Sequence, residues 1–191
     1  SFSYNPIFSR DCSGFSISSL CADNLVDDRF LDDRFLDENL DPICKAALDS
    51  KVMWVTIPLL ENSSISDPEK RKIFKEKILT YGDKYQNLNF SFEAETTAEN
   101  ALDIAKERDN FWLTYDTGNI TSERIEHKDY ITKTQGKISN VHLKDRTFNA
   151  KTVIPLSGDT PFDLIFNTLS SVNYNGLYTI QTARGVTGSE Q

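Results

Sequence analysis

The chain has 191 residues, of which 38% are hydrophobic and 26% are charged, and its formal net charge is −8. This length suits one domain, residues 1–191, and the apolar content is enough for a sizeable core, so there is no reason to expect disorder. Nucleic-acid binding normally requires a basic patch or stripe, which an acidic chain does not favour, and we expect no nucleic-acid partner.

Strand-like and helical segments alternate along the chain. The apolar runs predict strands at residues 14–20, 52–57, 88–93, 111–115, 138–142 and 177–181. Helical patterns fall near residues 40–50, 67–81, 97–108, 122–133 and 161–172. Because parallel neighbours need a crossover and helices are the usual one, the alternation predicts a parallel sheet in the α/β class.

One helix carries clear end signals. Asp67 precedes Pro68, which is typical of an N-cap followed by a proline in the first turn. Gly82 is predicted to end this helix, as Pro58 is predicted to close the strand before it.

Six strands fall short of the eight in a closed (β/α)₈ TIM barrel, which typically takes about 250 residues. Nothing before residue 15 has the pattern of a strand and a crossover helix, so the first two βα units are the missing ones. The sequence predicts an incomplete TIM barrel, either a fragment or a natural truncation. Two open sheet edges would make such a chain poorly stable or associate it into a homo-oligomer.

Four predicted strands end in a side chain that can bind a metal or carry a proton. These side chains are Glu93, Asp116, His142 and Gln181. In a parallel barrel the carboxyl ends of the strands share one rim, where barrel enzymes place their chemistry. Carboxylates and imidazole are the ligands that hold a divalent ion next to a sugar carbonyl. Each residue alone also has a purely structural explanation, but their shared position favours a site. His127 lies in a polar helix and is predicted to be exposed.

Six blocks of sequence, in order, cover nearly the whole chain. They are residues 18–23, 57–64, 115–119 (Tyr-Asp-Thr-Gly-Asn), 141–146 (Val-His-Leu-Lys-Asp-Arg), 153–159 and 174–184. Their order and spacing resemble the sugar phosphate isomerase/epimerase family of xylose isomerase-like TIM barrels. The resemblance implies that the first strand seen here is the third of the barrel.

In that family a divalent metal, often Mn²⁺, is held by Glu, Asp, His and Glu on four strand ends. The resemblance therefore implies that Glu93, Asp116, His142 and Gln181 are metal ligands. Mn²⁺ is the expected ion, with Zn²⁺, Mg²⁺ and Co²⁺ as alternatives.

The family's two glutamates exchange protons with the sugar, and the resemblance gives the role of catalytic base to Glu93. Gln181 departs from the pattern, because a glutamine carbonyl can ligate a hard cation but cannot accept a proton near neutral pH. Either Glu93 acts as a single base in an isomerisation, or a second base comes from Asp145 or Glu61. The catalytic candidates are therefore Glu93, Gln181 and Asp145.

The resemblance also indicates residues for substrate binding. Asn119 stands where many relatives have a histidine that touches the substrate, and Glu61 belongs to one of the matching blocks. Lys144, Arg146 and Arg184 gather near the same rim and suggest a phosphate or carboxylate on the substrate, since arginine binds such groups bidentately. Surface salt bridges with neighbouring carboxylates are the simpler alternative.

Two functions remain open. The first is a metal-dependent isomerase or epimerase of a small sugar or sugar phosphate, which moves a proton at a carbon next to a carbonyl. The alternative is a sugar-binding pseudoenzyme or barrel fragment that lost catalysis because Gln181 replaces the second glutamate. The endonuclease branch of the same barrel is disfavoured, because its multi-metal site is rich in histidine and this chain has two.

The cysteines and the lack of long apolar runs bear on location. Cys12, Cys21 and Cys44 leave at least one thiol unpaired in a monomer and are too few for a disulfide scaffold. No run approaches the roughly 18 apolar residues of a membrane helix. We expect a cytoplasmic protein with no membrane partner.

Overall fold

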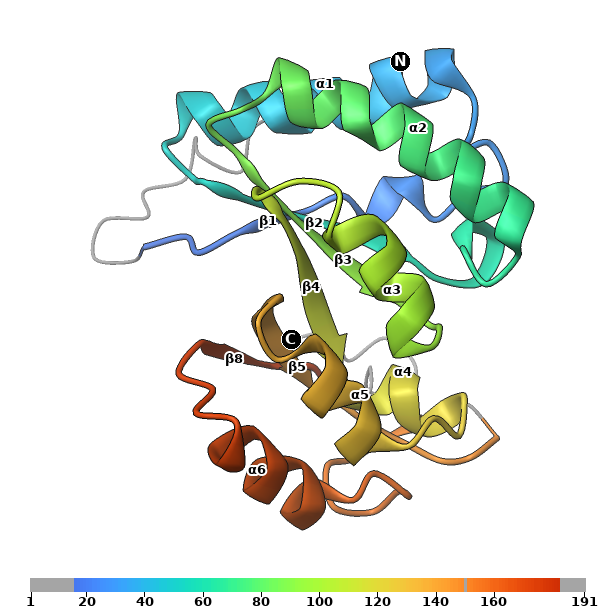
Figure 1. Ribbon diagram of the computed structural model, residues 1–191, viewed down its shortest axis with the longest axis vertical. Helices are drawn as coiled ribbons and strands as arrows, with labels where there is room; N and C mark the ends of the chain where they lie inside the picture. The colour runs from blue at the N-terminus through green and yellow to red at the C-terminus, as the bar shows by residue number, and fades with distance from the viewer. Residues whose placement is uncertain (1–15, 150, 183–191) are drawn as a thin grey trace, which may run out of the picture.

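The computed structural model describes residues 16–149 and 151–182, and its centre is a six-stranded parallel sheet in the order β1-β2-β3-β4-β5-β8 (Figure 1). The strands are β1 (Leu20–Cys21), β2 (Trp54–Leu59), β3 (Asn89–Ala94), β4 (Phe111–Asp116), β5 (Ile138–Leu143) and β8 (Leu177–Ile180). Consecutive strands are neighbours and all run parallel, which confirms the predicted incomplete (β/α)₈ barrel.

The crossovers between the strands are helical. The helices are α1 (Asp33–Asp49), α2 (Pro68–Lys84), α3 (Ala98–Ala105), α4 (Thr117–Ser122), α5 (His127–Thr134) and α6 (Phe162–Ser171), with the short 3₁₀ turns η2 (Asp23–Leu25) and η3 (Glu61–Ser63). In Figure 1, α1 and α2 lie near β1 to β3, and α5 and α6 lie near β5 and β8. Two short strands, β6 (Asp145–Arg146) and β7 (Thr152–Val153), form an antiparallel ribbon after β5.

Alternation along the strands separates an apolar face from a polar one. In β3, Phe90 and Phe92 are buried, and the Phe92 ring lies 6.0 Å from Phe74 of helix α2. The residues between and after them, Ser91 and Glu93, point the other way because side chains alternate along a strand. The apolar face therefore packs on the helices, and the polar face is the interior of the barrel.

Several predicted boundaries shift in the structure. β1 is limited to Leu20–Cys21 and so shares only Leu20 with the strand predicted at 14–20, because among the described residues these two alone pair with β2; residues 14 and 15 lie outside the described part. β2 does not stop at Pro58, because its pairing with β3 continues to Leu59. Helix α5 starts at His127, after the separate helix α4, because Glu126 caps it by accepting from the Lys128 amide.

Helix α2 begins as predicted but ends later. The Asp67 carboxylate accepts from the Lys70 amide at 2.9 Å, which confirms the N-cap. The prediction that Gly82 ends the helix is wrong, since α2 continues to Lys84. Gly82 is instead required by packing: a Cβ there would lie 2.7 Å from Arg108 Cδ and 2.8 Å from Phe111 Cε1.

The prediction of an exposed His127 is wrong. Its side chain is buried, 6% exposed, with Nδ1 2.6 Å from the Tyr115 hydroxyl and Nε2 3.0 Å from the Thr121 hydroxyl. Burial lowers the pKa of His127 to about 4. The signal was available in the sequence, because His127 is three and four residues before Tyr130 and Ile131, which face the core.

The last strand of the described chain presents apolar side chains to solvent. Every residue of β8 is exposed, and Leu177 is 57% and Ile180 72% exposed. β8 pairs only with β5 among the described residues, so its other edge is open. None of the described helices has both the length and the apolar character that crossing a membrane requires.

Candidate metal centre

Strand register brings the candidate ligands to one rim of the sheet. Glu93 lies near the end of β3, Asp116 ends β4, and His142 lies near the end of β5 as the pairing partner of Asp116. Gln181 directly follows β8, and its backbone N–H donates to the Leu143 carbonyl at 3.0 Å. Four adjacent strands therefore each present one polar side chain at their carboxyl ends, as the sequence predicted.

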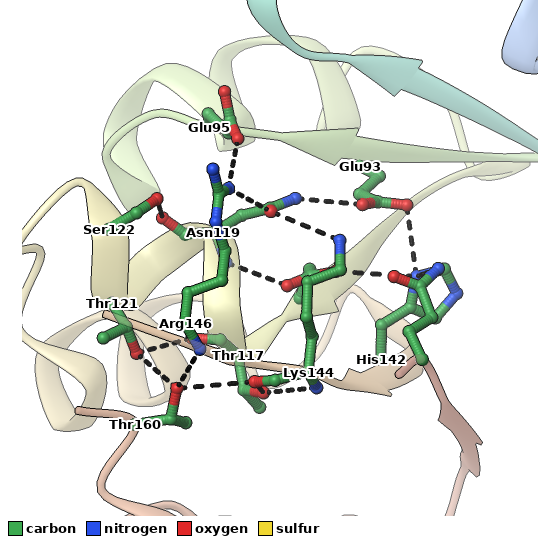
Figure 2. A network of polar contacts seen from close by, with 12 residues as sticks. Glu93, Glu95, Thr117, Asn119, Thr121, Ser122, His142, Lys144, Arg146 and Thr160 are labelled. Carbon is green, nitrogen blue, oxygen red and sulfur yellow. Dashed lines mark hydrogen bonds and ion pairs between the residues drawn. The ribbon is translucent and has the colours of Figure 1, made fainter. Parts of the chain in front are cut away.

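The four side chains meet at one nitrogen, Nδ1 of His142. Glu93 Oε2 lies 3.1 Å from this atom, Asp116 Oδ2 lies 4.0 Å from it, and the Gln181 side-chain amide nitrogen lies 2.9 Å from it. Figure 2 shows Glu93 and His142 pointing toward one another from β3 and β5, the strands on either side of β4. All three ionisable members are buried, with Glu93 4%, Asp116 2% and His142 6% exposed.

Burial and charge act on the two carboxylates in different ways. Burial raises the pKa of Glu93, but the hydrogen bond and charge of His142 and the charge of Lys144 outweigh it and hold this pKa below its ordinary value. Burial and the negative charge of Glu93 raise the pKa of Asp116 to about 6. The Lys144 ammonium lies 2.9 Å from Asp116 Oδ2 and offsets part of this effect.

The residues present fit a divalent cation. Glu93, Asp116 and His142 each offer one ligand atom, and these atoms lie within 4.8 Å of one another. Ligand atoms about 2.1 Å from one ion are roughly 3 to 4 Å apart, and the two distances to His142 Nδ1, 3.1 Å from Glu93 and 4.0 Å from Asp116, fall in this range. Asp116 Oδ2 is buried and forms an ion pair with the Lys144 ammonium at 2.9 Å, but no hydrogen bond of good geometry reaches it from the described residues. Asp116 Oδ2 can therefore accept a bond from a divalent metal ion.

Gln181 completes the cluster only as a neutral group. His142 Nδ1 cannot donate a proton to Glu93 and accept one from Gln181 at the same time. Ligation through Nδ1 requires its lone pair, and the Gln181 amide would then have to turn its oxygen toward the centre. The oxygen and nitrogen of such an amide are interchangeable by one rotation, so the turn needs no backbone movement.

Asn119 ties the carboxylates together. Its backbone N–H donates to Asp116 Oδ1 at 2.8 Å, and its side-chain Nδ2 donates to Glu93 Oε1 at 2.9 Å. Its Oδ1 accepts from Arg146 Nη1 at 2.9 Å, and the same Arg146 nitrogen donates to Glu95 Oε1 at 2.8 Å (Figure 2). The two rim cations, Lys144 and Arg146, thus both lie against carboxylates of this site.

The remaining candidates fall outside this cluster. The buried Asp145 carboxylate accepts from the Gly158 N–H at 2.8 Å and the Thr160 N–H at 3.2 Å, so it holds the loop that follows β6. Glu61 is exposed in η3. Arg184 lies outside the described residues.

Sequence reasoning missed Glu95, which fixes the position of Arg146. A signal existed, because residues two apart at the end of a strand point to the same side and Glu95 follows Glu93 by two. It also missed Thr117, whose hydroxyl accepts from the Lys144 N–H at 2.9 Å and so anchors the chain that carries Lys144.

Comparison with known proteins identifies the fold. No family model matches the chain, and no curated protein matches it. Solved structures of the xylose isomerase-like TIM barrel fold do match. A D-tagatose 3-epimerase-like protein superposes with a TM-score of 0.68 at 17% identity, covering 86% of this chain and 70% of its own.

Two further solved structures agree with the first. An L-ribulose 3-epimerase has a TM-score of 0.68 at 17% identity, over 87% of this chain and 61% of its own. The 3-keto-D-glucoside 4-epimerase of E. coli has a TM-score of 0.67 at 15% identity, over 91% and 74%. The chain has the fold of these barrels and spans roughly two thirds of their length.

Proposed function

We propose that this chain is the catalytic part of a metal-dependent sugar isomerase or epimerase. The observation that carries the proposal is the convergence of Glu93, Asp116, His142 and Gln181 at one point of the rim. The structural neighbours, which are named as sugar epimerases, support the same reaction class. Metal ligation is assigned to these four residues, with Mn²⁺ as the expected ion and Zn²⁺, Mg²⁺ or Co²⁺ as alternatives. Such an ion, when bound, polarises the carbonyl and the adjacent hydroxyl of the sugar.

Glu93 is the residue suited to proton transfer. Its lowered pKa keeps the carboxylate ionised near neutral pH, so it can accept a proton from the carbon next to the carbonyl. The C–H bonding pair then forms the double bond of an enediolate, and the proton of the neighbouring hydroxyl moves to the former carbonyl oxygen. Returning the carbon-bound proton to the former carbonyl carbon completes an aldose–ketose isomerisation.

None of the three candidates for a second base, Gln181, Asp145 and Glu61, is placed to act as one, which favours a single base. Gln181 cannot accept a proton near neutral pH, and the Asp145 carboxylate is engaged by two backbone amides on the loop after β6. Glu61 is exposed on η3. Epimerisation needs a proton donor on the opposite face of the enediol, whereas isomerisation can use one face. We therefore favour isomerisation over epimerisation.

The substrate is proposed to be a small sugar, and its hydroxyls would face Lys144 at the rim. Lys144 and Arg146 already pair with Asp116 and Glu95, which favours an uncharged sugar over a sugar phosphate. The free thiols of Cys21 and Cys44 fit a reducing compartment such as the cytoplasm.

Deuterium uptake tests the proposal without knowledge of the sugar. The protein is incubated with Mn²⁺ in D₂O together with a panel of aldoses and ketoses, and mass spectrometry detects deuterium on carbon. We expect uptake at the carbon beside the carbonyl of at least one sugar, and loss of that uptake by about 10³-fold or more in Glu93→Gln. Equal uptake by wild type and Glu93→Gln would rule out Glu93 as the base.

Gln181 favours a second candidate, a sugar-binding pseudoenzyme. A neutral amide replaces a charge at the centre, so the site could bind a sugar without moving a proton. Saturable sugar binding by calorimetry with no deuterium uptake for any sugar would support this candidate. If Gln181→Glu then gained deuterium uptake, the amide would be the disabling change.

A further inference from the structure

Asn119 is almost completely enclosed, and both ends of its side-chain amide are hydrogen-bonded to other side chains of the protein. The residue is 1% exposed, its Nδ2 donates to Glu93, and its Oδ1 accepts from Arg146. Lys144 Nζ lies a further 3.5 Å from the same oxygen. A group that is buried and bonded at both ends is suited to hold its neighbours in place.

The orientation of the Asn119 amide is fixed by chemistry. A guanidinium can only donate, so the atom facing Arg146 must be the amide oxygen. An ionised carboxylate can only accept, so the atom facing Glu93 must be the amide nitrogen. The usual ambiguity between the two ends of an amide is absent here, because both partners demand the same orientation.

A closed ring of contacts surrounds this amide. Arg146 Nη1 joins Asn119 to Glu95, and Glu95 lies two residues beyond Glu93 on the same chain segment. The backbone N–H of Asn119 adds a bond to Asp116. Figure 2 shows the ring, with Asn119 between Arg146 and Glu93.

We infer that Asn119 is a positioning residue, which holds the Glu93 carboxylate in place through an amide that Arg146 and Glu95 lock. This role differs from the substrate contact that the family resemblance implies for Asn119. The inference rests on the proposed role of Glu93 as ligand and base. With Oε1 held by Asn119, Oε2 is the Glu93 oxygen that faces the centre beside His142.

Two measurements test this inference on the whole chain. Mn²⁺ affinity is measured by calorimetry, and urea unfolding is measured without added cation, for wild type, Asn119→Leu, Arg146→Met and the double variant. The matched control is Ser122→Ala, because Ser122 lies in the same helix and donates only to the Asn119 carbonyl. Asn119→Ser serves if the leucine variant does not fold, since its shorter side chain cannot bridge to Glu93.

We expect Asn119→Leu to weaken Mn²⁺ binding by about 10- to 100-fold, as loss of a hydrogen-bond partner of a ligand typically does. Arg146→Met should weaken it as well, but should add nothing in the double variant, because Arg146 acts through Asn119. Ser122→Ala should bind as wild type does. Unchanged binding in Asn119→Leu, or additive losses in the double variant, would overturn the inference.

The outcome separates this inference from the proposed function. If wild type does not bind Mn²⁺, the metal centre is wrong, and unfolding in the absence of cation decides the role of Asn119. Losses of stability that are not additive between Asn119→Leu and Arg146→Met would still support the locked amide. Additive losses would overturn it.

Discussion

Glu93 and Asp116 are almost fully buried, and their carboxylates face the same few ångströms of space. Two such charges are costly unless cations accompany them. Lys144 supplies one positive charge, 2.9 Å from Asp116 Oδ2. The negative charge that Lys144 does not offset is what a divalent ion would neutralise, and within the described residues Asp116 Oδ2 has no hydrogen bond of good geometry.

The strand ends alone predicted the four residues of the cluster. Period-two alternation and the shared rim of a parallel sheet are enough to place Glu93, Asp116 and His142 together. The hydrogen bonds that fix the Asn119 side chain could not be predicted from the sequence, because they require Arg146 and Glu95 to meet across two loops. Loop geometry is not encoded in a local pattern of side chains.

His127 should make stability depend on pH. Its pKa is about 4 in the folded chain and ordinarily about 6.5, because burial disfavours the charged ring. Between pH 6.5 and 4 the unfolded chain binds a proton that the folded chain does not, so stability falls as pH falls through this window. The full loss is on the order of 3 kcal/mol.

The measurement is urea unfolding of wild type and His127→Gln at pH 7 and pH 4.5. The variant loses the titrating ring, so its stability should fall less between the two pH values. The same fall in both proteins would show that His127 does not titrate as proposed.

At the scale of elements, substitution by alanine is expected to change the stability of the fold in opposite directions at Gly82 and Gly136. Alanine favours a helix by about 1 kcal/mol over glycine. At Gly82 in α2, however, the new Cβ would press against Arg108 and Phe111. Gly136 lies in the turn after α5, where no atom of the described residues lies within 4 Å of an added Cβ.

We expect Gly82→Ala to destabilise the fold by about 1–3 kcal/mol. Gly136→Ala should be neutral or stabilising by up to about 1 kcal/mol. Thermal and urea unfolding of both variants check this. A more stable Gly82→Ala protein would show that Arg108 and Phe111 can move to accommodate the added Cβ, and would contradict the packing explanation.

The type and order of the elements could be predicted, while their ends depended on tertiary contacts. The Asp67 cap has a local hydrogen bond and was predicted. Gly82 was misread because its reason is a contact with a later segment. β1 was overestimated because pairing with β2, and not its own apolar pattern, sets its length.

At the scale of the molecule, the six strands form an arc of a barrel, and among the described residues no strand pairs with the outer edge of β8. Leu177 and Ile180 on β8 are largely exposed, and an exposed apolar edge strand favours pairing with another chain. The parallel sheet was predicted, but how much apolar surface lies open depends on which strands have neighbours.

We expect the 191-residue chain to associate as its concentration rises. Leu177→Lys should reduce the association, because a lysine on an edge strand resists pairing. Sedimentation velocity at several concentrations measures both proteins. A wild-type chain that stays monomeric and melts cooperatively would contradict this expectation.

The central claim, a divalent cation at the rim, is tested most directly by titrating Mn²⁺ into wild type and His142→Ala. The account predicts one ion bound per wild-type chain and a loss of binding by at least 10-fold in the variant, since His142 supplies the nitrogen on which the cluster converges. An absence of binding in wild type, or equal binding in both proteins, would contradict it.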